Sequence, residues 1–227
     1  NISVTDCDGT VSSVPSMEDV VCTIPEVNEW FEIEVDTRIS GDSPSDSFNL
    51  ALDYGNITVD WESNGGLDSI TDITGLSDSR LLHQYTTEGI YTIRIKGFGA
   101  FRFQDKPEAS KILSKKNNGS FNHNSLDGAF RKCVNMVDLA TDTLIAPSNM
   151  RSCFLRCYNL TPLYYVNTSE VSTLQSCFYE TSLNADLGAW DLRKCTNMGT
   201  FAALVTTWST PNYNASLMGF LRMQAGD

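Results

Sequence analysis

Cysteine and histidine are the side chains of this chain best suited to metal binding or nucleophilic catalysis. Cys153 and Cys157 are separated by three residues, no second pair has zinc-finger spacing, and the histidines are His83 and His123. We therefore predict no metal site and interpret the cysteines as small buried residues. The seven cysteines, whose disulfide state the sequence leaves open, are Cys7, Cys22, Cys133, Cys153, Cys157, Cys177 and Cys195.

Two short motifs begin like ligand sites and do not continue as such. Asp6-Cys7-Asp8-Gly9 starts like a calcium loop, but Met17 stands where the loop needs a glutamate, so an Asp-Gly turn is favoured. Gly97-Phe98-Gly99 starts like a dinucleotide loop, but Arg102 replaces the third glycine. Esterase, zinc-protease and phosphate-loop motifs are also absent from the sequence. We predict a protein that is not an enzyme and has no catalytic residue and no cofactor.

The residues that must position any site belong to a repeat of constant length. Its four copies open with residue types that cap helices, at Asn124, Ser148, Ser172 and Thr196, so the copies follow a 24-residue period. In the first copy, Leu126, Ala129, Phe130 and Cys133 stand at i, i+3, i+4 and i+7, the spacing of one helical face. A second apolar stripe with the same period falls where the sequence favours strand, at Leu139, Leu163 and Leu187. Each repeat is thus predicted to run as cap, short helix, turn and short strand.

One such unit is too small to bury its own apolar face, so the copies must stack as a solenoid and share a core. Stacking places Cys133 over Cys157 and Cys153 over Cys177, where small side chains fill equivalent positions. In the last copy the large and small residues are exchanged, at Phe201-Ala202, which we interpret as the point where the array begins to close.

Upstream of the repeats the pattern is that of strands. Residues 31–39 alternate strictly between apolar and charged side chains, which predicts a half-buried strand. Further predicted strands cover 48–52, 57–61, 90–96 and 100–103, with Gly-rich turns between them. Several short strands without helical periodicity predict an all-β sandwich.

The distribution of charged residues also changes between the strand-rich first half and the repeats. The net charge is −12, and residues 1–110 have 20 acidic and 6 basic side chains, whereas residues 111–227 have 8 and 10. We therefore predict two domains, and the acidic first half argues against nucleic acid or an anionic membrane as partner. No apolar run is long enough to cross a bilayer, so we expect no membrane insertion. The chain starts at Asn1, and we expect it to be part of a longer polypeptide.

Two segments of the first half form a recognisable pair of motifs: Ile57-Thr58-Val59-Asp60-Trp61 and His83-Gln84-Tyr85-Thr86-Thr87-Glu88-Gly89-Ile90-Tyr91-Thr92-Ile93. With them this part of the chain resembles an immunoglobulin-like domain of the polycystic-kidney-disease (PKD) type. The chain departs from the family at Glu62-Ser63-Asn64, where the PKD pattern has Gly-Asp-Gly. The resemblance implies a β-sandwich over residues 30–105, in which His83 makes a structural hydrogen bond.

The repeats resemble the divergent leucine-rich repeats of bacterial and mycoplasma surface proteins, called BspA-like. The second copy shows this best, as Ser148-Asn149-Met150-Arg151-Ser152-Cys153-Phe154 followed by Leu155-Arg156-Cys157-Tyr158-Asn159-Leu160-Thr161. Thr210 as cap and Pro211 at the first helical position predict a closing helix, with Tyr213, Leu217, Phe220 and Leu221 on one face.

The predicted fold is mainly β with short helices: a PKD-type immunoglobulin-like β-sandwich and a short α/β solenoid of the leucine-rich type. Residues 1–29 are assigned to a linker or the end of an upstream module, 30–105 to the sandwich, 106–123 to a junction, and 124–227 to the solenoid. In the junction we interpret Lys111, Lys115 and Lys116 as a solvated face.

The resemblance implies attachment or display rather than catalysis. The predicted function is that of a virion surface protein of a bacteriophage, such as a tail fibre, that binds a protein or glycan of the host. The alternatives are a bacterial cell-surface adhesin and a purely architectural protein of a virion or cell envelope; an enzyme acting on surface polysaccharide is a further one. An extracellular, oligomeric assembly with other virion or envelope proteins is expected. Aromatic residues near the strands and turns form the predicted recognition surface: Tyr158, Tyr164, Tyr165, Tyr179 and Trp190.

Overall fold

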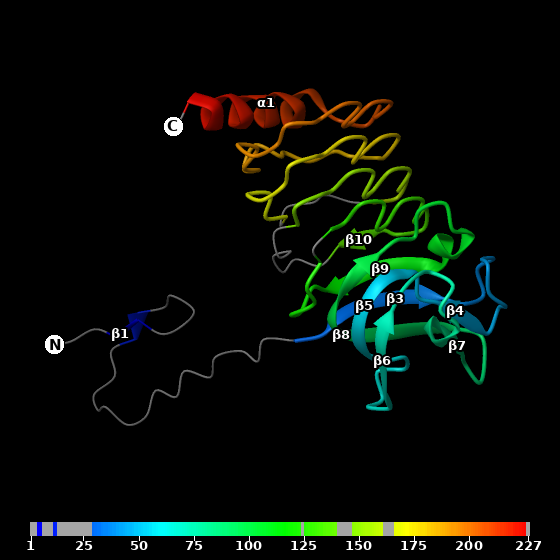
Figure 1. Ribbon diagram of the computed structural model, residues 1–227. Coiled ribbons are helices and arrows are strands. Elements are labelled where there is room, and N and C mark those ends of the chain that lie inside the picture. Colours follow the sequence, from blue (N-terminus) through cyan, green and yellow to red (C-terminus); the bar gives the residue numbers. More distant parts are fainter. Residues whose placement is uncertain are drawn as a thin grey trace.

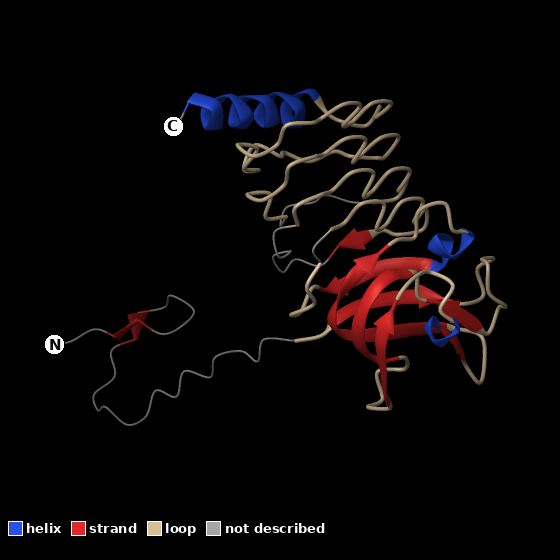
Figure 2. Ribbon diagram, in the orientation of Figure 1, coloured by secondary structure: helices blue, strands red, loops and turns tan. Residues whose placement is uncertain are grey.

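The computed structural model describes residues 4–5, 11–12, 29–123, 125–139, 147–160 and 166–225. The described part is mainly β, with a large, mostly antiparallel sheet, stacked turns and one C-terminal α-helix (Figures 1 and 2). The small elements outside the large sheet are β1 (Val4–Thr5) paired with β2 (Val11–Ser12), β4 (Ser47–Asn49) paired with β7 (Leu82–Gln84), and the 3-10 helix η1 (Ser79–Leu81).

The large sheet has six strands in the order β10-β9-β3-β8-β5-β6. In chain order they are β3 (Phe31–Asp36), β5 (Leu52–Asp60), β6 (Leu67–Ile73), β8 (Ile90–Phe101), β9 (Ile112–Asn117) and β10 (Asp138–Leu139). The alternation predicted from residue 31 is confirmed over β3, where Phe31, Ile33 and Val35 are buried. β8 runs unbroken where two strands were predicted, and β6 was not predicted.

The segment assigned to a junction is part of the sheet. The 3-10 helix η2 (Pro107–Lys111) leads directly into β9, which pairs with β3 on one side and with β10 on the other. The prediction of a solvated lysine face is wrong for Lys111 and Lys115, both at most 1% exposed. Lys116 does face water and lies 3.4 Å from Glu34 Oε2. The sheet therefore extends into the first repeat through the short parallel pairing of β9 with β10.

The residues of the PKD-like motif pack as a column of rings. His83 stacks on Trp61 with 4.8 Å between ring centroids, and the Tyr85 hydroxyl donates to the Trp61 carbonyl. The prediction of a hydrogen-bonded His83 is not confirmed, because its buried Nε2 has no partner among the described residues. Asp60 forms the turn at residues 62–65, since its carboxylate accepts from the N–H groups of Asn64 and Gly65.

The predicted short helices of the repeats are wrong: each repeat instead makes two consecutive tight turns. Cys153 N donates to Met150 O and Cys157 N to Phe154 O, and the third residue of each turn, Ser152 or Arg156, has a positive φ. This is the pattern of type II turns, which require a left-handed residue at that position. Positive φ angles recur twice in every repeat. They fall in the first turn at Gly128, Ser152, Ser176 and Thr200, and in the second turn at Lys132, Arg156, Glu180 and Leu204.

We call the repeats beginning at 124, 148, 172 and 196 the first to fourth rungs. Alternate N–H groups of a rung donate to carbonyls of the next rung, as from Met150 to Thr173 and from Phe154 to Cys177. The opening residues were predicted to cap helices, but Ser172 and Thr196 donate their hydroxyls to the preceding rung. The following residue accepts instead, as Asn149 Oδ1 does from Arg151 N. Hydrogen bonds between rungs therefore replace those of the predicted helix.

The predicted strand stripe has three outcomes. Leu139 lies in β10, opposite Lys115 of β9. Leu163 lies outside the described residues, and Leu187 is buried but is not in a strand. Single parallel bridges between Asn149 and Thr173, and between Thr173 and Asn197, are the β pairing between rungs in the described residues.

One hydrophobic core runs through the sheet and the rungs. Its axis in the rungs is a stack of phenylalanine rings, with 5.8 Å between the centroids of Phe130 and Phe154 and 5.6 Å between those of Phe154 and Phe178. Phe201 meets Phe178 edge on, so the exchange at Phe201-Ala202 ends the parallel stack. The in-register cysteines fill the core as free thiols, and burial raises the pKa of Cys133 and Cys153.

The closing helix α1 (Thr210–Ala225) forms as predicted, but a different face packs inward. Ser216 is buried, its hydroxyl accepts from Leu187 N, and Gly219 lies against the backbone of Gly188. A side chain at Gly219 would overlap that backbone, so the helix can approach closely only on this side. Of the predicted inward residues, Phe220 is partly buried, whereas Tyr213, Leu217 and Leu221 are exposed.

His123 makes stability depend on pH. Its ring is 2% exposed among Phe31, Phe101 and Phe121, both nitrogens are unpartnered in the described residues, and burial lowers its pKa to about 3 from 6.5. Below pH 6.5 the His123 side chain is protonated in the unfolded state but stays neutral in the folded state. The free energy of unfolding therefore decreases as the pH falls from 6.5 towards 3. We expect His123→Leu to reduce the loss of unfolding free energy between pH 7 and pH 5 by about 2 kcal/mol.

Urea unfolding of both proteins at the two pH values measures this effect. A variant that loses as much stability as the wild type over this interval would show that another group causes the dependence. His83→Leu is the matched control: burial also lowers the pKa of His83, but this ring is less enclosed and a smaller change is expected.

Candidate recognition surface

Side chains that lie outside the hydrophobic core line one edge of the rungs. The second residue after the left-handed position of the second turn lies on this edge, in register at Val134, Tyr158 and Ser182. Asn159 Nδ2 donates to Val134 O, and the Ser182 hydroxyl donates to Tyr158 O. The edge is thereby fixed across three rungs, and we call these residues, with the pocket described next, the recognition surface.

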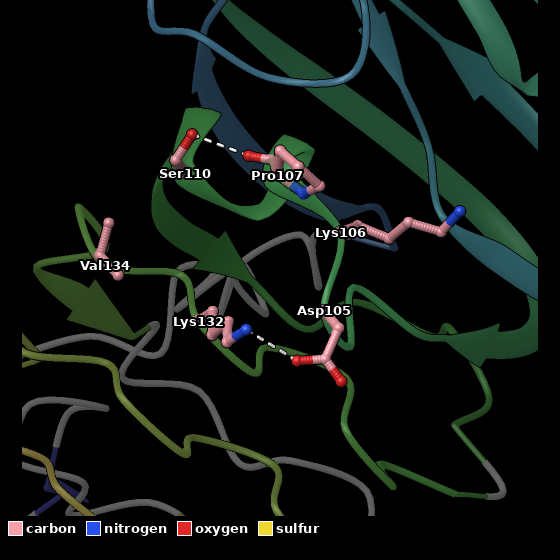
Figure 3. A pocket seen from close by; sticks show the side chains of 6 residues that line it. All are labelled: Asp105, Lys106, Pro107, Ser110, Lys132 and Val134. Carbon is pink, nitrogen blue, oxygen red and sulfur yellow. Dashed lines mark hydrogen bonds and ion pairs between the residues drawn. The ribbon is translucent and has the colours of Figure 1, made fainter.

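A pocket lies where this edge meets the sheet (Figure 3). Its volume is about 220 Å³, and it is lined by Asp105, Lys106, Pro107, Ser110, Lys132 and Val134. The walls come from the turn before η2, from η2 itself and from the second turn of the first rung with the residue that follows it. Pro107 and Val134 make the pocket partly apolar, while charged groups stand around them.

Asp105 is held ionised by cations of the first rung. Lys132 Nζ lies 2.8 Å from Asp105 Oδ1, and an Arg131 nitrogen lies 3.3 Å from the same oxygen. The hydrogen bond from Lys132 lowers the pKa of Asp105. Lys106 has no ion-pair partner among the described residues and in Figure 3 points away from Asp105. Two lining cations, Lys106 and Lys132, and one carboxylate give this pocket a positive balance in an acidic protein.

Tyr158 is the exposed aromatic of the surface, with 43% of its area accessible. Beside it, Arg156 Nε lies 2.8 Å from Glu180 Oε2, which joins the second and third rungs. The hydrogen bond to Glu180 raises the pKa of Arg156. The phenol therefore stands next to a fixed ion pair, so an apolar ring face and several polar groups are offered together.

The predicted recognition residues have different positions. Tyr158 is exposed, Tyr179 is half-buried, and Tyr164 and Tyr165 lie outside the described residues. The assignment of Trp190 to the surface is wrong, because this side chain is 3% exposed. It packs against Phe178 and Phe201, where the phenylalanine stack ends and a large side chain is needed to close the core.

The pocket residues were not predicted. Asp105 and Ser110 are far from Lys132 and Val134 in the chain, and the predicted helix placed Lys132 on a helical turn. The sequence feature nearest to this region was the cluster of Lys111, Lys115 and Lys116, which was interpreted as a solvated face. Pairing of β9 with β10, which fixes the first rung against η2, creates the pocket.

Ser110 and the two histidines are held in structural contacts. Ser110 Oγ donates to the carbonyls of Pro107 and Ser40, so its hydroxyl is not activated by a base. His83 stacks on Trp61 and meets Tyr85 edge on, and His123 is enclosed by phenylalanine rings in the core. Among the described residues, no cluster of three or more His, Cys, Asp or Glu side chains is arranged to hold a metal ion.

Comparisons with family models, curated proteins and solved structures gave no match for this chain. In the parts of the chain that the structure describes, no helix has the length and apolar character to span a bilayer.

Proposed function

We propose that the chain is a non-enzymatic attachment protein that binds a protein or glycan of a host cell through the recognition surface. The observation that carries this proposal is the exposed Tyr158, fixed beside the Arg156–Glu180 ion pair and one rung from the pocket. An aromatic face with adjacent hydrogen-bonding groups suits the apolar face and hydroxyl groups of a sugar or the side chains of a peptide.

The proposal includes the finer description of the fold. The column of Trp61, His83 and Tyr85 supports an immunoglobulin-like sandwich of the PKD type. The hydrogen bonds that recur from rung to rung support a solenoid of the leucine-rich type. This combination, by resemblance, suits an extracellular protein of a bacteriophage virion, such as a tail fibre; a bacterial cell-surface adhesin is the alternative.

Tyr158→Ala tests the recognition surface. Multimerised wild-type protein is screened against bacterial cells and against an array of their surface glycans, and the variant is measured on whatever binds. We expect about tenfold weaker binding, equal to about 1.4 kcal/mol, because the ring supplies the central apolar contact. Tyr54→Ala is the matched control, since Tyr54 is similarly exposed, at 39%, but lies on β5 of the sheet. Equal losses for both variants, or no binding by the multimer, would contradict the proposal.

An architectural role in a virion or cell envelope is the second candidate function. It is favoured by the union of sheet and rungs in one core, which makes a stiff connector. Deleting residues 120–227 cannot separate the two functions cleanly, because it removes β10 from β9 and uncovers that core. The point variant Tyr158→Ala is the better test. If the variant still assembles but no longer attaches to cells, recognition is supported. If its attachment is unchanged, the architectural role is supported.

A further inference from the structure

The last rung has an open edge of hydrogen-bond donors. In the first three rungs, the N–H groups at four alternate positions each donate to the next rung, twelve bonds in all. In the third rung, for example, Ser176 N donates to Gly199 O and Phe178 N to Phe201 O. The equivalent N–H groups of the fourth rung have no acceptor in the described residues: those of Met198, Thr200, Ala202 and Leu204. In each of the first three rungs, the equivalent N–H groups are directed towards the following rung. By the same geometry, those of the fourth rung are directed away from the third.

The helix beside this edge has an apolar outer face. Its packed side holds Ser216 and Gly219 against residues 187–188, and the opposite side exposes Leu217, Met218 and Leu221 together with Asn214. At the flank of the helix, Tyr213 is exposed and meets Trp208 edge on. With Leu204, the four exposed apolar side chains of the helix make five of the twelve exposed large hydrophobics of the described residues. Figure 1 shows α1 and the fourth rung together forming the end of the stack.

The fourth rung and α1 lack the polar outer face that is typical of the terminal unit of a stacked array. A terminal unit of a stacked array needs a polar outer face to stay soluble. A row of free N–H groups also invites pairing with another backbone. Here the donor edge and the apolar helix face lie at the same end of the molecule, and we call them together the end surface.

We propose that the end surface binds a polypeptide segment of a partner protein that runs as a fifth rung. Such a segment supplies backbone carbonyls at alternate residues to Met198, Thr200, Ala202 and Leu204. It also covers the outer face of α1 with apolar side chains. α1 has no acidic residue and one basic residue, Arg222, in its last turn, so an acidic or neutral partner segment is accommodated.

A second copy of this chain does not fit the donor edge. Two copies placed end to end would bring two rows of N–H groups together, and neither row offers an acceptor. A head-to-tail arrangement would need the carbonyl edge of the first rung. There, Ala129 O already accepts from Phe103 N, at the joint with the sheet. The partner is therefore a different polypeptide.

The test uses a synthetic peptide as the fifth rung. The probe has the sequence of residues 171–184 with Cys177→Ser; its parent segment offers four carbonyls to the second rung, as from Thr173 to Met150 and from Tyr179 to Arg156. Fluorescence anisotropy measures its binding to the full chain, and hydrogen exchange with mass spectrometry locates it. We expect slower exchange at residues 198–204 on binding, and no effect from a scrambled peptide.

Charge on α1 supplies the matched variants. Leu217→Glu/Leu221→Glu is expected to raise the dissociation constant of the probe at least tenfold, because both side chains are on the outer face. Leu67→Glu is expected to leave it unchanged, since Leu67 is 56% exposed but lies on β6. All three positions are exposed, so these variants should fold, which circular dichroism verifies.

Several outcomes overturn the proposal. They are no slower exchange at residues 198–204 up to millimolar peptide, equal binding of the scrambled peptide, or equal weakening by Leu67→Glu. Concentration-dependent dimerisation in sedimentation that is abolished by Leu217→Glu/Leu221→Glu would assign the helix face to a second copy and also overturn it. None of these results bears on Tyr158, which lies on another edge, so the two proposals fail independently.

Discussion

Lys111→Met is expected to lower the free energy of unfolding by about 3–5 kcal/mol, the usual cost of removing one partner from a buried ion pair. The Lys111 ammonium is 0% exposed and lies 3.5 Å from Glu108 Oε1. It donates to the carbonyls of Ser43, Pro44 and Ser47 and to the Ser43 hydroxyl, at 2.7–3.2 Å. Methionine would occupy the space of the aliphatic part of the lysine side chain, but it has no N–H group to donate to these acceptors.

Glu108 makes the loss larger, because its carboxylate is buried too. It accepts from the N–H groups of Asp42, Ser43 and Asn49, so it holds the same loop to η2 from the other side. Without Lys111 this charge has no cation within the enclosed site. The pair therefore fixes the loop between β3 and β4 on the sheet.

The measurement is chemical unfolding of Lys111→Met beside its matched control Lys116→Met. Lys116 lies further along β9, is 44% exposed, and its contact with Glu34 is on the surface, so a change of about 0–1 kcal/mol is expected. A double-mutant cycle with Glu108→Gln isolates the coupling of the pair, expected at about 0.5–3 kcal/mol. Equal effects of the two lysine variants would refute the buried-pair account.

Phe154→Ala is expected to destabilise the protein by about 3–5 kcal/mol. Phe154 is fully buried in the middle of the phenylalanine stack, and its ring is within 8° of parallel to both neighbours. Truncation removes two ring contacts and leaves a cavity between rungs that backbone hydrogen bonds hold apart. The rungs cannot collapse to fill it without breaking those bonds, so the cost should lie at the high end for a core residue.

Thermal and chemical unfolding measure the effect, with Phe98→Ala as control. Phe98 is in β8 and 42% exposed, so its truncation should cost about 1 kcal/mol or less. If Phe154→Ala costs no more than the control, the rungs adjust freely and the stack does not determine their spacing.

The sequence predicted the buried positions of the rungs but not their backbone. Leu126, Ala129, Phe130 and Cys133 are all buried, as their spacing indicated. Two consecutive turns place side chains inward at the same intervals as a helix, so periodicity alone cannot separate the two. The hydrogen bonds decide: the N–H of Phe154 donates to the carbonyl of Cys177 in the next rung, not to a carbonyl of its own turn.

The candidate site was predicted in part for a similar reason. Tyr158 was correctly placed on the surface, whereas Trp190, of equally suitable chemistry, is in the core. Which aromatic is exposed depends on where the phenylalanine stack ends, and that follows from packing between rungs. The pocket around Asp105 was not predicted, because it exists only where η2 meets the first rung.

The sequence by itself determined the period of the repeats, the alternation of β3, the mainly β class and the position of the closing helix. These depend on local patterns of apolar side chains, which any fold of this chain must bury. The tertiary structure alone decided the turns, the burial of Lys111 and Lys115, the pocket and the orientation of α1. Each of these depends on a contact between distant segments, whether a rung with the next rung, β9 with β10, or Gly219 with Gly188.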